Sequence, residues 1–300
     1  MKKIFITSLM IATVFLSFSC GQTKENKEAN TDEAVISKDI YIQLYSVRDD
    51  IKSDFKGTIA AVAEAGYKGV ETASYNDGKF YGLSPEEFKS EIEAVGMEVL
   101  SSHTGRPLEE NIENTNWEDV WNWWDTAIDA HKRAGMKYIA TPWMPTPSTL
   151  KDLKQYCDYF NQIGEKCNAA GIKFGYHNHD FEYKEIEGEV MYDFMLENTD
   201  PDKVFFEMDV YWTTKGGHDP VEYFNRYPNR FKLLHIKDEK ELGGNDSVMD
   251  FDNLFQKIDK SGVEHIIVEV EHYNFEPLVS VKQSIDYLLN NDNVKADYSK

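Results

Sequence analysis

The chain has 300 residues, of which 41% are hydrophobic and 13% aromatic, and its formal net charge is −21. This hydrophobic content supports one large core or two modest ones and excludes a chain that is disordered throughout. The charge argues against a nucleic acid as partner, because contacts with phosphates need clustered Lys and Arg. Small neutral molecules, or molecules held through a metal ion, are the partners that fit this composition.

The N-terminus predicts export. Lys2 and Lys3 precede a long apolar stretch, so residues 1–19 are predicted to be a signal peptide. Cys20 resembles the lipid-modified cysteine of bacterial lipoproteins, which implies cleavage before it and lipidation, with an ordinary secretory signal as the alternative. Residues 20–36 are polar and predict a flexible tether. We therefore expect a lipoprotein of the cell envelope that touches the membrane only through its anchor.

The other two cysteines are not expected to form a disulfide. Cys157 and Cys167 lie in one predicted helix, ten residues apart. Their separation along the helix is about 15 Å, whereas a disulfide needs Cα atoms within about 7 Å. Both are expected to be free thiols, buried in the core.

Strand-like and helix-like segments alternate from residue 37 onward. Runs rich in β-branched and aromatic residues alternate with stretches of helical periodicity, and capping residues and glycines support the boundaries between them. In chain order, we expect a strand at 39–46, a helix at 54–66, a strand at 68–73, a helix at 85–95, a strand at 97–103, a helix at 115–134, a strand at 137–142, a helix at 148–170, a strand at 172–178, a helix at 188–197, a strand at 204–210, a helix at 219–227, a strand at 231–237, a helix at 250–260, a strand at 264–271 and a helix at 275–290.

This alternation predicts the fold class. Eight strand and helix pairs over about 260 residues are typical of a single (β/α)₈ TIM barrel, with its active site at the C-terminal ends of the strands. An open doubly wound sheet is the alternative, but it should carry a glycine-rich loop after the first strand, and residues 42–50 (IQLYSVRDD) contain no glycine. We assign residues 37–292 to the barrel and residues 293–300 to a C-terminal tail.

Ionisable residues cluster in the last turns of the predicted strands. In the last four strands they come in pairs two residues apart, so both members of a pair face the same side of the strand. Burial of such groups is costly unless they are paired or hold an ion. Convergence of these groups inside one barrel therefore predicts a functional site, formed by Glu71, His103, His177, His179, Glu207, Asp209, His235, Lys237, Glu269 and Glu271.

The residue types indicate a metal site. One His, one Asp, one His and one Glu from strands five to eight offer two imidazoles and two carboxylates, a set suited to one divalent ion of Mn, Co, Zn or Fe. The second residue of each pair is then free for proton transfer. An ion with open positions and a nearby base can remove a proton next to a sugar carbonyl, which is the first step of isomerisation, epimerisation and β-elimination.

Four short motifs resemble one known family. They are YHNHDFE (176–182), FFEMDVYW (205–212), LLHIKD (233–238) and IIVEVE (266–271), in the order found in the xylose isomerase-like TIM barrel superfamily and its sugar phosphate isomerase/epimerase branch. The resemblance implies a metal held by His177 or His179, together with Asp209, His235 and Glu269. His177 aligns with the position at which relatives carry the metal ligand of the fifth strand, so we assign His177 as the ligand. His179, Glu207 and Glu269 are then the catalytic candidates. Trp212 stands where epimerases of the family carry a His.

Several further residues are candidates for binding substrate. Glu71 and His103 resemble substrate-site positions, with a salt-bridged interior pair as the alternative. Lys237 can hold a substrate oxygen or neutralise the neighbouring carboxylates. Trp143, Tyr211 and Trp212 are expected to form a wall on which a sugar ring stacks, with aromatic packing as the alternative for any one of them. Glu182 is predicted either to orient one of the two histidines or to be a solvated loop acid, and the helix of residues 115–134, with four Trp, is expected to pack on the barrel.

The predicted activity is a divalent-metal-dependent carbohydrate isomerase or epimerase that acts through an enediolate. A lyase that cleaves a 3-keto-glycoside by β-elimination on the same metal site is the alternative within enzymes. A non-catalytic sugar-binding lipoprotein is the alternative of another class, because a fold does not by itself give an activity. Endonuclease activity, known in the superfamily, is disfavoured by the negative charge and the predicted export.

Overall fold

The computed structural model of the protein describes residues 37–300. The predicted signal peptide, Cys20 and the tether of residues 20–36 lie outside the described residues. Eight parallel strands form the central sheet, in the order β3-β2-β1-β10-β9-β8-β5-β4. They are β1 (Ile40–Gln43), β2 (Gly69–Thr72), β3 (Glu98–Ser102), β4 (Tyr138–Thr141), β5 (Lys173–His177), β8 (Val204–Asp209), β9 (Phe231–Ile236) and β10 (His265–Val268).

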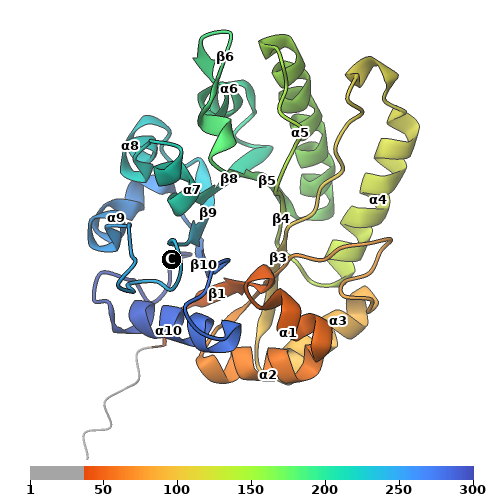
Figure 1. The fold of residues 1–300 in the computed structure, drawn as a ribbon. Helices are drawn as coiled ribbons and strands as arrows, with labels where there is room; N and C mark the ends of the chain where they lie inside the picture. Colours follow the sequence, from red (N-terminus) through yellow and green to blue (C-terminus); the bar gives the residue numbers. More distant parts are fainter. Residues whose placement is uncertain (1–36) are drawn as a thin grey trace, which may run out of the picture. The chain divides into compact units, whose positions relative to one another are not determined.

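The sheet curls into a barrel with helices around it, so the predicted (β/α)₈ class is confirmed (Figure 1). Each of the eight strands is followed by a helix. The principal helices are α2 (Phe55–Ala65), α3 (Pro85–Ala94), α4 (Trp117–Arg133), α5 (Leu150–Ala170), α6 (Met191–Asn198), α8 (Pro220–Arg226), α9 (Phe251–Lys257) and α10 (Pro277–Asn290).

The barrel closes weakly between its first and last strands in sheet order. β3 and β4 share one isolated bridge, between His103 and Ala140, in place of a full ladder. Two backbone hydrogen bonds support it: Thr104 N–H donates to the Ala140 carbonyl at 2.9 Å, and Lys137 N–H donates to the Leu100 carbonyl at 2.9 Å. This seam is therefore held by fewer backbone hydrogen bonds than the other strand pairs.

Local sequence explains the element boundaries. Ser84 and Glu87 form a capping box at the start of α3, with Pro85 at the first helical position, as predicted. Gly66 ends α2 in the left-handed region at φ 106°, where residues with a Cβ are strained.

Some short elements depart from the prediction. The strands are shorter than expected because their ends turn at once into helical segments, namely η1 (Leu44–Val47) and α1 (Arg48–Ser53) after β1, and α7 (Val210–Lys215) after β8. A small antiparallel hairpin, β6 (Glu185–Ile186) and β7 (Glu189–Val190), precedes α6 where helix was predicted from residue 188. Gly188, at φ 89°, makes its turn.

The bottom of the barrel interior is filled by one layer of apolar side chains. Six strands each contribute one residue to a buried cluster: Tyr41, Leu100, Tyr138, Phe205, Leu233 and Ile267. The remaining two strands contribute glycines. A Cβ on Gly69 would lie 2.9 Å from the Tyr41 ring, and one on Gly175 would lie 2.6 Å from the Phe205 ring. The glycines therefore make room for the two aromatic rings, in a packed interior typical of TIM barrels.

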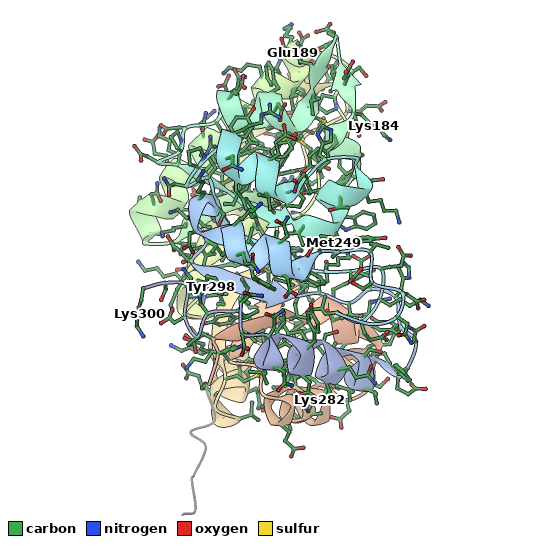
Figure 2. All side chains as sticks on the ribbon, turned by 90° about the vertical axis from the view of Figure 1, so that its left-hand side faces the viewer. Lys184, Glu189, Met249, Lys282, Tyr298 and Lys300 are labelled. Carbon is green, nitrogen blue, oxygen red and sulfur yellow. The ribbon has the colours of Figure 1, made fainter. Side chains whose placement is uncertain are left out.

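The helices cover the outside of the barrel. Trp124 of α4 is fully buried and donates from Nε1 to the Tyr159 hydroxyl of α5 at 2.6 Å, so this helix packs as predicted. Cys157 and Cys167 are free and buried, which confirms that prediction. Val294 of the C-terminal tail is buried, and Asp39 N–H donates to the Ala296 carbonyl. Figure 2 shows charged side chains over the outer face, such as Lys282 on α10 and Glu189 on the hairpin. Among residues 37–300, no helix is long and apolar enough to cross a bilayer.

The contact between Gly175 and Phe205 gives a testable prediction. Gly175→Ala places a methyl group against the Phe205 ring, and we expect the free energy of unfolding to fall by about 1–3 kcal/mol, the usual cost of overpacking. Gly175→Ala combined with Phe205→Leu should recover most of that loss. Urea unfolding of the three proteins measures both effects, and equal stability of wild type and Gly175→Ala would contradict this account of the barrel floor.

Candidate active site

A layer of polar side chains lies directly above the apolar layer. Side chains two residues apart on a strand face the same way, so the floor residues are followed two positions later by a second inward-facing layer, which is polar on every strand except β4, where Ala140 follows Tyr138. Tyr41 is followed by Gln43, and Phe205 by Glu207. The polar layer includes Gln43, Glu71, His177, Glu207, His235 and Glu269, all of them buried. The predicted convergence of ionisable groups at the C-terminal ends of the strands is therefore present.

A cavity of about 450 Å³ opens above this layer. Seven of the predicted site residues line it: His103, Trp143, His177, His179, Trp212, Glu269 and Glu271. The other five lie beneath or behind its wall as buried residues: Glu71, Glu207, Asp209, His235 and Lys237. Trp143, which follows the end of β4, is half exposed. The cavity thus has aromatic walls and an ionisable floor.

The four predicted metal ligands come together. One ligand atom from each of His177, Asp209, His235 and Glu269 lies within 4.8 Å of the others. His177 Nε2 is 3.7 Å from Asp209 Oδ2, and His235 Nδ1 is 3.3 Å from Glu269 Oε2. Both ring nitrogens of His177 and Oδ2 of Asp209 are buried without a hydrogen-bond partner among the described residues. Orphaned buried polar atoms are costly, so this mixed nitrogen and oxygen set fits a divalent ion.

The surroundings of this set fix its geometry. Asp209 caps α7, since its Oδ1 accepts from Trp212 N–H at 2.9 Å, which leaves Oδ2 free to face His177. Glu71 accepts a hydrogen bond from Nε2 of His235 at 2.7 Å, which turns Nδ1 toward Glu269. A carboxylate that holds the far nitrogen of a histidine is the usual outer-sphere support of a metal ligand.

A second group of ionisable residues lies deeper, around His103. Its Nε2 is 2.8 Å from Glu207 Oε2 and 3.2 Å from Glu71 Oε1. Glu71 also accepts from Gln43 Nε2 at 2.7 Å and from Ser101 Oγ at 2.6 Å. The predicted alternative of a salt-bridged interior pair therefore describes Glu71 and His103, and His103 lines the cavity as well.

Within this deep group, the pKa of Glu71 is lowered, whereas the pKa values of Glu207 and His103 are raised. Burial opposes charge on Glu71, but His103 and His235 outweigh it and lower the pKa of Glu71 to about 2. Burial, together with repulsion from Glu71, raises the pKa of Glu207 to about 7. For His103, burial is outweighed by the charges of Glu71 and Glu207, so its pKa is raised. His103 is thus favoured in its protonated form.

The pKa of His179 is shifted in the opposite direction to the pKa of His103. Burial lowers the pKa of His179 to about 4, and its Nδ1 has no partner among the described residues. Glu182 is fully buried, accepts from His179 N–H at 2.8 Å and from the Tyr176 hydroxyl at 2.7 Å, and so is not a solvated loop acid. It fixes the backbone of His179, while the ring stays free and neutral at the cavity wall.

Lys237 neutralises carboxylates. Its Nζ lies 2.7 Å from Glu271 Oε1, 3.1 Å from Glu269 Oε2 and 3.8 Å from Asp209 Oδ2. It also sits 4.7 Å from the centre of the Trp212 ring. Burial is outweighed by the charges of Glu269 and Asp209, so the pKa of Lys237 is raised and the ammonium stays charged. Of its two predicted roles, this geometry provides the neutralising one.

Two residues of the site were missed from the sequence. Gln43 ends β1 and pairs in register with Glu71, and Tyr45 follows it and lines the cavity. A polar residue at the C-terminal end of the first predicted strand is the signal that could have pointed to both, because the residues after barrel strands form the active-site face.

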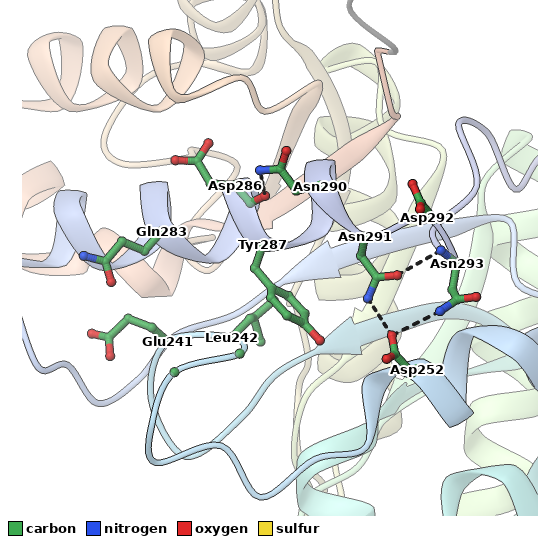
Figure 3. Close-up of a pocket in the computed structure, with 12 residues that line it drawn as sticks. Glu241, Leu242, Asp252, Gln283, Asp286, Tyr287, Asn290, Asn291, Asp292 and Asn293 are labelled. Carbon is green, nitrogen blue, oxygen red and sulfur yellow. Dashed lines mark hydrogen bonds between the residues drawn. The ribbon is translucent and has the colours of Figure 1, made fainter.

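A larger cavity elsewhere lacks such features. It measures about 640 Å³ and lies between the loop after β9 and the end of α10 (Figure 3). Its amide side chains are already paired: Asp252 Oδ1 accepts from Asn291 and Asn293. No group of candidate metal ligands is found there among the described residues. The convergence of ionisable groups, not cavity size, identifies the candidate active site.

Comparison with known proteins agrees with the fold. Residues 59–291 match the family model described as xylose isomerase-like TIM barrel. The chain is 34% identical to a sugar phosphate isomerase/epimerase from Parabacteroides distasonis ATCC 8503, whose crystal structure superimposes with a TM-score of 0.81 over 86% of this chain and 96% of that chain.

More distant relatives are similar over less of their length or in fold alone. An inosose dehydratase from Lacticaseibacillus casei is 28% identical over 157 residues, which are 43% of this chain and 52% of the relative, so the chain spans about half the length of that protein. The crystal structure of IOLI protein with a binding zinc atom is 12% identical, with a TM-score of 0.67 over 87% of this chain and 100% of that chain, and shares the fold.

The ligand assignment gives a prediction about metal content. His177→Ala and Asp209→Asn should each bind less than a tenth of the metal bound by wild type, since each removes an atom that faces the ion position. His179→Ala, which removes the neighbouring imidazole, is the matched control and should keep its metal. Elemental analysis after loading with Mn, Co, Zn or Fe measures this, and full occupancy in His177→Ala would refute the assignment.

A second prediction concerns stability without metal. Burial, partly offset by Lys237, raises the pKa of Asp209 from 3.8 to about 7. The folded state therefore binds a proton more tightly than the unfolded state, and this contribution to stability is lost as pH rises from about 4 to 7. In EDTA, Asp209→Asn should be more stable than wild type at pH 8 by about 2–4 kcal/mol and no more stable at pH 4. Urea unfolding at both pH values tests the sign.

Proposed function

Because the chain belongs to the xylose isomerase-like TIM barrel family, we propose that it is a divalent-metal-dependent enzyme that modifies a carbohydrate by removing a proton next to a carbonyl group. One observation carries this proposal. One cavity is lined by the neutral, unpaired imidazole of His179, the ion-paired imidazole of His103 and two of the candidate metal ligands, His177 and Glu269, while the other two ligands, Asp209 and His235, lie directly behind its wall.

We favour elimination, carried out by a lyase, over isomerisation. Groups whose surroundings push their pKa values apart are candidates for base and acid. His179 is neutral and can accept the proton of a C–H bond next to the carbonyl. The charges of Glu71 and Glu207 raise the pKa of His103, which favours a protonated ring that can donate to the departing oxygen. The similarity to inosose dehydratase supports the same reaction type.

The remaining residues have supporting roles in this proposal. His177, Asp209, His235 and Glu269 would hold the ion, which supplies Lewis acidity at the substrate carbonyl. Zinc is the first metal to test, because the similar IOLI protein binds it. Glu207 positions His103 from behind the cavity wall, and Trp143 and Trp212 provide apolar faces for a sugar ring.

An isomerase or epimerase is the second candidate. The relative at 34% identity carries that name, and isomerisation begins with the same proton removal. Trp212 argues against epimerisation in particular, since an indole cannot return a proton to the other face of the carbon, whereas isomerisation can use a single base. A non-catalytic sugar-binding protein would need neither the metal ligands nor the two oppositely tuned histidines.

The test is proton exchange combined with product analysis. Metal-loaded protein is incubated in deuterated water with free ketoses, inososes and 3-keto-glycosides, and NMR follows both deuterium incorporation next to the carbonyl and the products. His179→Gln should lower exchange and product formation by a factor of about 10²–10⁴. His103→Gln should lower product formation by a similar factor yet keep exchange, because the first proton removal does not need the acid.

The exposed His272 offers a matched control outside the cavity, and His272→Gln should have wild-type rates. An isomeric product with no loss of water or alcohol would favour the isomerase. Absence of exchange with every substrate in protein that holds its metal would refute the enzymatic proposal.

A further inference from the structure

A second cavity adjoins the candidate active site. It measures about 410 Å³ and shares two lining residues, Tyr45 and Ala73, with the cavity of the candidate active site, so the two cavities are neighbours. It lies between the segment after β1 and the loop from β2 to α3. Its main lining residues are Tyr45, Arg48, Lys52, Phe55, Ser74 and Tyr81.

The aromatic wall of this cavity is held in a fixed position. Tyr81 has φ 51°, which is rare for a bulky residue. Its hydroxyl accepts from Ala73 N–H at 3.2 Å, and its ring packs 5.6 Å from Phe55 and 6.0 Å from Phe88. The surface offered by Tyr81 is therefore built before any ligand arrives.

Hydrogen-bond donors accompany the aromatic rings. The Arg48 guanidinium lies 4.4 Å from the centre of the Tyr45 ring and donates to the Tyr273 hydroxyl at 2.7 Å, while Tyr45 remains 43% exposed. Lys52 is exposed and forms no salt bridge with any residue of 37–300. Aromatic faces beside cationic donors suit a ring with hydroxyl groups, since its C–H faces stack and its oxygens accept hydrogen bonds.

The proposed acid stands next to this second cavity. His103 N–H donates to the carbonyl of Thr72, the residue before Ala73, at 2.8 Å. His103 and the shared wall are thus neighbours, whereas His179 packs against Phe181 and Trp212. An oxygen that joins two rings across the shared wall would lie on the His103 side of the catalytic cavity.

We propose that the second cavity is a subsite for the leaving ring of a glycoside. This inference rests on the proposed function and specifies its substrate class: a keto sugar linked through oxygen to a second ring. His179 takes the proton of the C–H bond next to the carbonyl, a carbon–carbon double bond forms, and the bond from the β carbon to the linking oxygen breaks. His103 gives its proton to that oxygen, so an unsaturated keto sugar and a free alcohol result.

Binding can be measured without turnover. Full-length protein in EDTA is titrated by calorimetry with matched pairs of probes, each a free sugar and its 4-nitrophenyl glycoside, for glucose, galactose and mannose. The glycoside of at least one pair should bind about tenfold more tightly than its free sugar, through contacts with Tyr81, Tyr45 and Lys52. Ser74→Trp, which fills the second cavity from a side chain with no hydrogen bond of its own among the described residues, should remove that advantage and leave binding of the free sugar unchanged.

Two further variants keep the result interpretable. Lys52→Ala should weaken glycoside binding alone, and Lys151→Ala, an exposed lysine on α5, is the matched control that should change nothing. Equal affinities within every pair, or an advantage that persists in Ser74→Trp, would overturn the subsite while leaving the proposed reaction intact. Failure of every sugar and glycoside to bind folded protein would count against the carbohydrate function itself.

Discussion

The alternation of side chains along the barrel strands is the constraint on which this site depends. Each strand that places an apolar or glycine residue in the floor must place the residue two positions later in the same interior, one layer higher. In this chain five of the eight strands place an ionisable residue in that second layer: Glu71, His177, Glu207, His235 and Glu269. Charges in such surroundings are stable only when they are paired, hydrogen-bonded or bound to an ion. The pairing pattern of the site follows from this requirement.

The two halves of the polar layer meet the requirement in different ways. In the deep half, Glu71 receives hydrogen bonds from Gln43, Ser101 and His235, and only Oε1 of Glu207 has no hydrogen-bond partner among the described residues. In the upper half, His177 and one oxygen of Asp209 have no partner among the described residues. His235 belongs to both halves, with one nitrogen toward each. The hydrogen bonds to Glu71 therefore form a rigid base beneath the candidate metal ligands, whose missing partner would be an ion from solution.

The sequence allowed the fold and the membership of the site to be predicted, but not the connections within it. Eight strands and the inward pairs on the last four could be located because alternation and helical periodicity are local patterns. The hydrogen bond between Glu71 and His235 joins residues 164 positions apart across the barrel, and no local pattern contains it. Tyr45 was missed because η1 begins directly after β1, where a longer strand was expected. The role of Asp209 as the cap of α7 was hidden in the same way.

The seam between β3 and β4 gives the site an unusual dependence on the whole fold. The one bridge that joins these strands is made by His103, the same residue that contacts Glu71 and Glu207 inside the barrel. Closure of the barrel between β3 and β4 and the contacts of the His103 imidazole with Glu71 and Glu207 therefore depend on the same residue. A chain in which seven strand pairs had formed but this edge stayed open would have native-like secondary structure and no organised site. An open edge between β3 and β4 would therefore displace His103, whose imidazole contacts both Glu71 and Glu207.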